Sequence, residues 1–318
     1  MAAGLAKHLG LLAGAAPPIV AELTGRLDTD GTEVRARYVG SGVNRDYLVG
    51  LVMDEPRELA RRCLPSYRHV PSAASARDTD GAEVACVLTD LPALWGMLTP
   101  RRAQYRFAAW VRQEVSLPPP GSAWVLPRPV EREAARLARR HGYTLDFATD
   151  PASLHRFYAE LYRPYVLARF GSGAIVVAER EFVAAARDCT LALLRQQDRW
   201  AAGVLLQRSG AELRFRWFGA ACSPPPDGAS DVLDVACILR AHSDGVRTVM
   251  LGASRPSLVD GVVRYKQKLG ARLCAVRYPQ SKLGIAVDRG QHAMFARLNG
   301  RRLVEIRGRG LVRVLEAS

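Results

Sequence analysis

The stretch LGASRPSLVDGVVRYKQKLGA, residues 251–271, determines the fold that the sequence predicts. Its first residue completes an apolar run over 247–251 that predicts a strand, and apolar residues then recur at helical spacing over 258–269. A further strand is predicted over 271–278. A strand, a helix and a second strand in this order predict a βαβ unit.

The residues that precede this unit predict a mixed α/β domain. Strands over 190–196, 200–207 and 212–220 are joined by tight turns, which predicts an antiparallel meander. Helices are predicted over 130–141, where Gly142 ends the helix, after the N-cap Asp150, over 178–187 and over 230–244. The predicted fold class is therefore α/β (α+β), with a mixed sheet flanked by helices.

Residues 251–271 resemble the C-terminal signature of Fem-type peptidyltransferases, the aminoacyl-tRNA-dependent enzymes of peptidoglycan bridges, and of their relatives with the GNAT acyltransferase fold. The signature is a strand that ends in Gly-x-Ser, then a glycine, an aromatic-lysine pair and a further glycine. In this chain those positions are Gly252, Ser254, Gly261, Tyr265, Lys266 and Gly270. Residues 131–147 and 157–171 resemble two further parts of the same domain more weakly. The resemblance covers about half of the chain and implies a GNAT-type acyltransferase domain.

The resemblance implies that Lys266 is the catalytic residue. Its positive charge would stabilise the oxyanion that forms when an amine attacks an activated acyl carbonyl, or hold the terminal phosphate of the acyl carrier. The alternative is an exposed helix lysine beside Lys268. Tyr265 would pack or stack against substrate, with an ordinary amphipathic contact as its alternative.

Other residues are candidates for substrate binding. Gly252 and Ser254 end the strand of the signature, where glycine allows a close approach of the backbone. Tyr162 and Arg169 lie in the segment 157–171, which resembles the acceptor-side helix and the Arg-x-Gly that follows it.

Two arginines are further candidates for substrate binding because of their places relative to predicted strands. Arg255 lies just beyond a strand end, where α/β proteins commonly bind ligands, and could hold a phosphate or carboxylate; a solvated arginine is the alternative. Arg216 alternates with apolar residues along the strand 212–220 and could therefore face the cleft.

The N-terminal half predicts a separate α/β domain over residues 1–116, for which the tandem arrangement of Fem-type enzymes suggests a divergent GNAT-like unit. Strands are predicted over 32–39, 47–53 and 82–89, a short helix over 56–63 and helical spacing over 102–115. The proline-rich stretch 117–129 predicts a linker, because proline cannot donate a hydrogen bond and restricts the residue before it. The acyltransferase domain then spans 130–318.

Charge and composition restrict the partners. The formal net charge of +14 favours a polyanion such as tRNA, with a solvated surface of biased composition as the alternative. Cysteines and histidines are scattered without metal-ligand spacing, so neither a metal site nor a tightly bound cofactor is predicted. No apolar run is long enough to span a membrane. The first 18 residues predict an amphipathic helix rather than a signal peptide, and a cytoplasmic location is expected.

These observations predict an amide-forming acyltransferase with an amine acceptor and with aminoacyl-tRNA as the preferred donor. The alternatives are an acyl-CoA-dependent N-acyltransferase of the same fold and a non-catalytic module that binds RNA or protein. CoA-binding GNAT domains usually hold pyrophosphate on a glycine-rich loop after the central strand. This chain has ACSPPPDGASD there, residues 221–231, with three prolines and two aspartates, which disfavours CoA. The sequence leaves the acceptor, the amino acid and the oligomeric state open.

Overall fold

The computed structural model describes residues 18–27, 31–42, 44–64, 84–90, 102–123, 125–171, 174, 176–222, 225–226, 228–274, 282–288, 290–307 and 311–315. The chain divides into two compact units. Unit 1 contains residues 1–111, 254–263 and 274–318, and unit 2 contains residues 112–253 and 264–273. This division differs from the predicted boundary, because the proline-rich stretch after residue 116 is a loop inside unit 2. The helix predicted for the first 18 residues lies outside the described residues, apart from Pro18.

Unit 2 is built on a seven-stranded mixed sheet with the strand order β12-β6-β11-β10-β9-β8-β7. The strands β7, β8, β9 and β10 form the predicted antiparallel meander, and β11 then pairs with β10 in parallel. The strands are β6 (Val111–Ser116), β7 (Tyr143–Ala148), β8 (Thr190–Gln196), β9 (Arg199–Ser209), β10 (Glu212–Ala220), β11 (Thr248–Ser254) and β12 (Arg272–Cys274).

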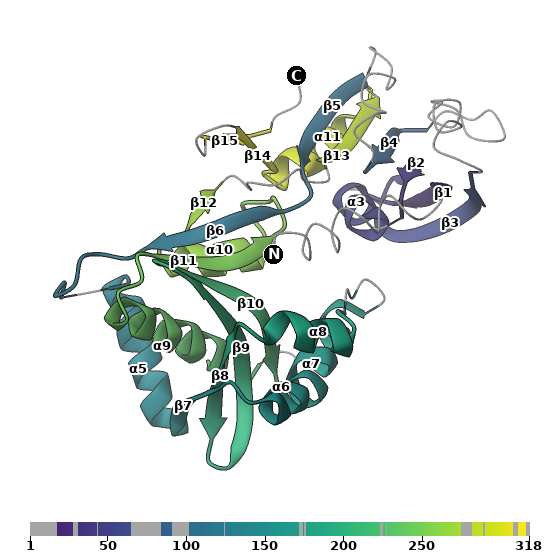
Figure 1. Cartoon of the computed structure of the whole chain (residues 1–318). Coiled ribbons are helices and arrows are strands. Elements are labelled where there is room, and N and C mark those ends of the chain that lie inside the picture. Colours follow the sequence, from purple (N-terminus) through teal and green to yellow (C-terminus); the bar gives the residue numbers. More distant parts are fainter. Residues whose placement is uncertain are drawn as a thin grey trace. The chain divides into compact units, whose positions relative to one another are not determined.

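Helices cover both faces of this sheet (Figure 1). On one face lie α5 (Arg128–His141) and α9 (Ala229–Ser243), which contact each other, and α9 packs on β7, β8 and β9. On the other face lie α6 (Pro151–Phe157), the π-helical turn η4 (Tyr158–Tyr162), α7 (Arg163–Phe170) and α8 (Glu179–Ala186). The helix α10 (Gly261–Lys268) connects β11 to β12 and completes the predicted βαβ unit.

The helix ends in unit 2 follow the predicted capping residues. Gly142 ends α5 in the left-handed conformation at φ 64°, which an L-residue with a side chain adopts only at a cost. The Asp150 carboxylate accepts a hydrogen bond of 2.8 Å from the Ser153 backbone N–H and so caps α6, while Pro151 occupies the first turn. Both predictions are confirmed.

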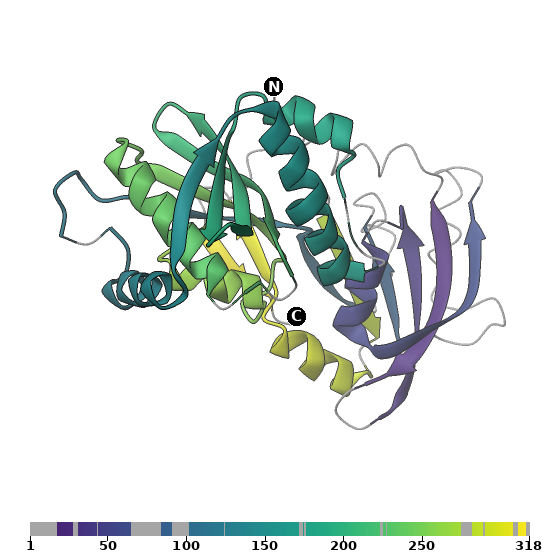
Figure 2. The same ribbon diagram turned by 90° about the horizontal axis from the view of Figure 1, so that it is seen from below.

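Unit 1 has its own sheet and its own core. Six strands lie in the order β3-β1-β2-β4-β13-β5, all antiparallel neighbours except the parallel pair β2 and β4. The helices α3 (Arg45–Val52) and α11 (His292–Gly300) pack together (Figure 2). Their apolar side chains belong to the core of unit 1. The strands are β1 (Ile19–Arg26), β2 (Glu33–Gly40), β3 (Asp54–Cys63), β4 (Cys86–Thr89), β5 (Arg102–Ala108) and β13 (Lys282–Asp288), and β14 (Val304–Arg307) pairs with β15 (Leu311–Val314).

Three predictions for unit 1 are wrong. The strand predicted over 47–53 is the helix α3, because Leu48, Val49, Leu51 and Val52 are all buried on one side of a helix. The helix predicted over 56–63 is the edge strand β3, which pairs with β1 along its length despite its helix-forming residues. The helical spacing over 102–115 is produced by two strands, β5 and β6, which are separated by Ala109 and Trp110.

The mixed α/β fold class with helix-flanked sheets is confirmed. Among the described residues, none of the helices is both long enough and apolar enough to cross a membrane.

Candidate active site

The strands β10 and β11 run together only over a short distance. Their parallel pairing joins Glu212, Leu213 and Arg214 to Thr248, Val249 and Met250 and ends there. On its other edge β10 carries an irregularity in its pairing with β9 between Phe215 and Phe218. A bulge changes the direction of a strand and releases backbone groups from the ladder. The ends of β10 and β11 that follow therefore lie beyond the regular pairing of the two strands.

Gly252 lies on β11 just after this pairing ends. It adopts φ 74°, and a Cβ atom there would lie 3.4 Å from the Phe215 carbonyl oxygen. The left-handed backbone and the close approach of β10 both favour glycine at this position. The close approach that the sequence predicts for Gly252 is thus present, and it is made to the protein's own strand.

Lys266 projects from α10 onto the end of β11. Its side chain is buried, and Nζ donates hydrogen bonds of 3.2 Å to the carbonyl oxygens of Gly252 and of Ala253. The alternative of an exposed helix lysine is therefore wrong. A buried ammonium is costly unless carbonyls or opposite charges surround it, so this lysine fixes a positive charge at the strand end.

Tyr265, the neighbour of Lys266, is anchored to the helix α9. Its hydroxyl donates a hydrogen bond of 2.9 Å to Oδ2 of Asp234. Burial raises the pKa of the Asp234 carboxyl to about 7, although the Tyr265 hydrogen bond and the charge of Lys266 both lower it. Burial and the same carboxylate raise the pKa of Tyr265. Asp234, Tyr265 and Lys266 are thus one electrostatically coupled group.

The sequence analysis missed Asp234. The signal was available, because Asp234 interrupts the apolar residues of the predicted helix 230–244. An acid on the buried side of a helix is rare unless it is paired, so such a residue indicates a partner elsewhere in the chain. The partner comes from α10, and neither helix alone reveals it.

Tyr162 lies in an aromatic cluster on the opposite face of the sheet. It is 3% exposed, its ring lies 5.2 Å from that of Phe182 and 6.2 Å from that of Trp217, and its hydroxyl accepts a hydrogen bond of 3.4 Å from the Val177 N–H. Burial raises its pKa. The backbone of Tyr162 also contacts β10 closely, since a Cβ atom on Gly219 would lie 2.6 Å from its nitrogen.

The two arginines predicted in unit 2 have different surroundings. Arg216 is partly buried in β10, where Nη1 donates a hydrogen bond of 2.7 Å to Gln207 and the guanidinium lies 5.1 Å from the ring centre of Trp217. Burial lowers its pKa. Arg169 is exposed near the end of α7 and donates a hydrogen bond of 2.9 Å to the Tyr165 hydroxyl. The structure therefore brings together Gly252, Tyr265 and Lys266 but places Tyr162, Arg169 and Arg216 in other contacts.

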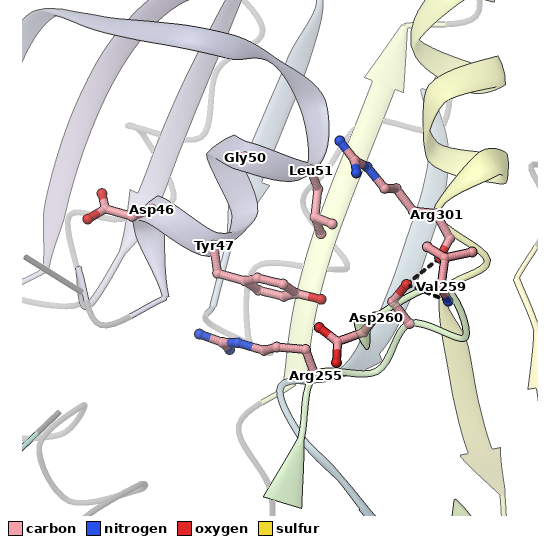
Figure 3. Close-up of a pocket in the computed structure, with 9 residues that line it drawn as sticks. Asp46, Tyr47, Gly50, Leu51, Arg255, Val259, Asp260 and Arg301 are labelled. Carbon is pink, nitrogen blue, oxygen red and sulfur yellow. Dashed lines mark hydrogen bonds between the residues drawn. The ribbon is translucent and has the colours of Figure 1, made fainter. Parts of the chain in front are cut away.

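Ser254 and Arg255 follow Ala253 directly in the chain and belong to unit 1. Ser254 is buried. The Arg255 guanidinium lies between two aromatic rings, 3.9 Å from the centre of Tyr47 and 4.0 Å from that of Trp110. Arg255 also borders a cavity in unit 1 (Figure 3).

The start of α9 lies in the segment 221–231, whose sequence disfavours CoA. Gly228 precedes α9 at φ 70°, and Asp231 lies in the first turn of the helix. Burial raises the pKa of Asp231. The charge of Lys268 lowers this pKa, and the charge of Glu133 raises it. A carboxylate in the first turn opposes an anionic ligand at this helix end. Pro224 and Asp227, part of the same prediction, lie outside the described residues.

Exposed arginines follow the polar face of α5. Arg132, Arg136, Arg139 and Arg140 are all exposed, and the Glu133 carboxylate pairs with Arg136 at 2.7 Å. Only Ala134 of this helix is fully buried. The helix thus presents a positively charged surface on unit 2, as its sequence predicts.

No protein-family model and no curated protein matches the sequence. Solved structures do match. The C-terminal domain (DUF2156) of a putative lysylphosphatidylglycerol synthetase from Agrobacterium fabrum is 14% identical, with 92% of this chain and 88% of that chain covered and a TM-score of 0.39. FemX is 10% identical, with 84% of each chain covered and a TM-score of 0.40. A GCN5-related N-acetyltransferase from Kribbella flavida is 15% identical, with 65% of this chain and 69% of that chain covered and a TM-score of 0.31.

A Fem-type protein and a GNAT acetyltransferase are thus among the solved structures that match. Identities and TM-scores are low, so we infer the function from the residues of the site itself.

Proposed function

We propose that the chain is an amide-forming acyltransferase that moves an aminoacyl group from aminoacyl-tRNA to an amine acceptor, with Lys266 as the catalytic residue. The observation that carries this proposal is the buried ammonium of Lys266 on the carbonyls of Gly252 and Ala253, at the point where β10 and β11 stop pairing.

The reaction needs little covalent help from the protein. The amine nitrogen attacks the ester carbonyl, a tetrahedral oxyanion forms, and the C–O bond to the ribose breaks. The proton that the amine loses finally resides on the released ribose hydroxyl. A fixed positive charge in a buried site stabilises the oxyanion and needs no rearrangement during the reaction. Lys266 supplies such a charge.

Asp234 and Tyr265 affect the ammonium of Lys266 without contacting the substrate in this proposal. The Asp234 carboxylate balances the ammonium, and its hydrogen bond to Tyr265 fixes the part of α10 that carries both residues. We therefore assign Asp234 a positioning role and leave the contact with substrate to Lys266.

Two features support tRNA over CoA as the carrier of the acyl group. The first turn of α9 carries Asp231, which opposes a bound pyrophosphate. The arginines of α5 form an exposed basic surface, and phosphate backbones bind to such surfaces. The CoA-dependent N-acyltransferase remains the second candidate because the fold is shared.

The test compares substitutions of two lysines on the same helix. Lys266→Met keeps the length and buried apolar stem of the side chain but removes the charge, whereas Lys268→Met removes a charge from an exposed position. Each variant receives tRNA charged with labelled amino acids and a panel of peptides with free amines. We expect transfer by Lys266→Met to fall by about 10²–10³-fold, the loss typical of a missing oxyanion-stabilising group, and transfer by Lys268→Met to stay near wild type.

The outcomes separate the candidates. Equal rates in the two variants remove Lys266 from the mechanism. Transfer of acetyl from acetyl-CoA, without transfer from tRNA, selects the second candidate. RNA binding without any transfer, and unchanged in Lys266→Met, indicates a non-catalytic RNA-binding module.

A further inference from the structure

A cavity of about 310 Å³ lies within unit 1. One wall is α3, with Tyr47 and Leu51, and another is the loop that follows β11, with Arg255, Val259 and Asp260 (Figure 3). Arg301, just after α11, closes a third side. The volume suits a small metabolite or the charged end of a larger one.

The walls of this cavity are held together independently of any ligand. The Ser257 hydroxyl donates to the carbonyl oxygen of Arg301, and the Leu258 N–H donates to that of Arg302 at 3.1 Å. The Val304 N–H donates to the Pro256 carbonyl at 2.8 Å. These bonds fix the loop after β11 to the segment after α11, so a ligand would meet a site that is already formed.

Arg255 lines the cavity, and some of its N–H groups make no hydrogen bond among the described residues. Nη1 donates to Oδ1 of Asn44 at 3.2 Å and to the Ala109 carbonyl at 3.4 Å. Among the described residues, no hydrogen bond engages Nε or Nη2. The guanidinium carbon lies 3.9 Å from the ring centre of Tyr47 and 4.0 Å from that of Trp110, so two aromatic contacts restrict its position. A fixed guanidinium edge with unused N–H groups matches the two oxygens of a carboxylate or phosphoryl group.

Tyr47 contributes a hydroxyl that is buried and has no hydrogen-bond partner among the described residues. Burial and the charge of Asp260 raise the pKa of Tyr47, while the charges of Arg255 and Arg301 lower it, which places both arginines and this carboxylate within electrostatic reach of the hydroxyl. A buried hydroxyl without a partner costs stability, and a ligand oxygen would remove that cost.

The charge of the cavity favours an anion. Arg301 has no ion pair among the described residues, and Arg255 has none either. Of the two carboxylates, Asp46 pairs with Arg45 at 2.9 Å and points away from Arg255 (Figure 3). Oδ1 of Asp260 accepts the N–H groups of Val262 and Val263, and the charge of Asp260 raises the pKa of Arg255, so two guanidinium groups line the cavity against this one nearby carboxylate. Burial lowers the pKa of Arg255 to about 10, so it stays charged at neutral pH.

We infer that this cavity is a binding site for the phosphoryl or carboxylate group of a small acidic molecule, held by Arg255, Arg301 and the Tyr47 hydroxyl. The inference is independent of the proposed transfer reaction, because it concerns binding alone and requires neither tRNA nor an amine.

Calorimetric titrations with two probes test the inference. Inorganic phosphate and succinate are titrated separately into the full chain at an ionic strength fixed with chloride, so that general screening of a basic protein is constant. We expect saturable binding of at least one probe, and the probe that binds more tightly identifies the chemical group. If neither probe binds saturably at millimolar concentration, the inference is wrong.

Two neighbouring arginines provide a matched control. Arg301→Gln and Arg302→Gln remove the same charge from adjacent positions, but Arg302 is exposed and does not line the cavity. We expect the first variant to bind the probe about tenfold or more weakly, as the loss of a charged hydrogen-bond donor implies, and the second to bind as the wild type does. Equal affinities of the two variants would show that the binding occurs elsewhere.

Tyr47→Phe separates binding from a structural role. Removing an unpaired buried hydroxyl should leave the melting temperature of the free protein unchanged or raise it. Binding of the probe should nevertheless weaken by about three- to tenfold, because one hydrogen bond to the ligand is lost. A variant that melts lower and binds the probe normally would contradict the assigned role of Tyr47.

Discussion

Asp234 occupies a buried position where ionisation of its carboxyl group costs free energy. Burial in the surroundings of α9 raises its pKa to about 7, against an ordinary value of 3.8. The Tyr265 hydroxyl and the charge of Lys266 oppose this shift. Near neutral pH the carboxyl therefore changes its protonation state, and each change alters the charge that faces Lys266. The charge that acts on Lys266 from α9 therefore depends on the protonation of Asp234.

The pH dependence of stability follows from the raised pKa of Asp234. The folded state holds the proton more tightly than the unfolded state, so this group favours folding below about pH 4, and the contribution is lost as pH rises towards about 7. We expect the free energy of unfolding of the wild type, relative to Asp234→Asn, to fall by about 1.4 kcal/mol per pH unit in this range. Urea unfolding at several pH values measures the difference.

A second variant tests whether the pH dependence belongs to Asp234 and not to another titrating group. Tyr265→Phe removes a hydrogen bond that lowers the Asp234 pKa, so the pH at which the loss levels off should move upwards. Parallel stability curves for the wild type and Asp234→Asn would contradict the shifted pKa of Asp234.

At the scale of elements, the long helical segment from α6 to α7 contains one wide turn. The π-helical turn η4 ends directly before α7, which has Pro164 in its first turn. Proline cannot donate to the carbonyl four residues earlier and its ring clashes with it, so a wider turn relieves the conflict. The wide turn brings the backbone of Leu161 and Tyr162 against Gly219 of β10.

Gly219→Ala tests this contact between a helix and a strand. The added methyl group would lie 2.6 Å from the Tyr162 nitrogen, and backbone atoms cannot move aside easily. We expect the free energy of unfolding to fall by about 1–3 kcal/mol, as is usual for overpacking. Gly261→Ala is the control, because a methyl group there meets nothing within 4 Å. Equal stability of the two variants would contradict a close packing contact between η4 and β10 at Gly219.

The helix α5 is the element expected to meet tRNA. Replacing Arg132, Arg136 and Arg139 by glutamine should reduce the slope of log affinity against log salt, by about 0.7–0.9 for each phosphate that the helix no longer neutralises. Replacing the exposed arginines Arg156, Arg180 and Arg187 changes the net charge equally and is the control. Filter binding between low and moderate salt measures both. The same slope in both triple variants would exclude α5 as a specific contact.

The elements of unit 2 are close to those predicted, and those of unit 1 are not. The predicted bounds of β8 and β10 agree with the structure, because apolar runs and turn pairs mark them locally. The edge strand β3 contains mostly residues that favour helices, and its conformation is set by pairing with β1. Local patterns cannot predict a conformation that a distant strand imposes.

The candidate site was predicted to a similar, partial extent. The signature located Lys266, Tyr265 and Gly252, which the structure brings together. It could not indicate that Lys266 is buried or that Asp234 acts on it, because both facts depend on contacts of α10 with β11 and α9. The cavity bordered by Arg255 depends on α3, which the sequence predicted as a strand.

For the whole molecule, the nature of the donor can be decided by thermal stability. A ligand that binds the folded state raises stability by about 2.7 kcal/mol at a concentration 100 times its dissociation constant. We expect millimolar acetyl-CoA to shift the melting temperature very little, because Asp231 and the prolines leave few donors for pyrophosphate. CoA alone serves as the control. A large shift with both ligands would contradict the preference for tRNA and support the CoA-dependent transferase.

The order of strands in unit 1 has a consequence for how the protein is made. The strand β13 lies between β4 and β5 in the sheet, yet it follows the whole of unit 2 in the chain. On the ribosome, β4 and β5 therefore emerge long before β13, which pairs with both of them. Unit 2 can fold during this interval, while the edges of β4 and β5 that pair with β13 remain unpaired. Unpaired edges favour contacts with other chains, and pairing over such a sequence separation is slow. A chain that stops before β13 would retain the residues of unit 2 and lose the continuity of the other sheet.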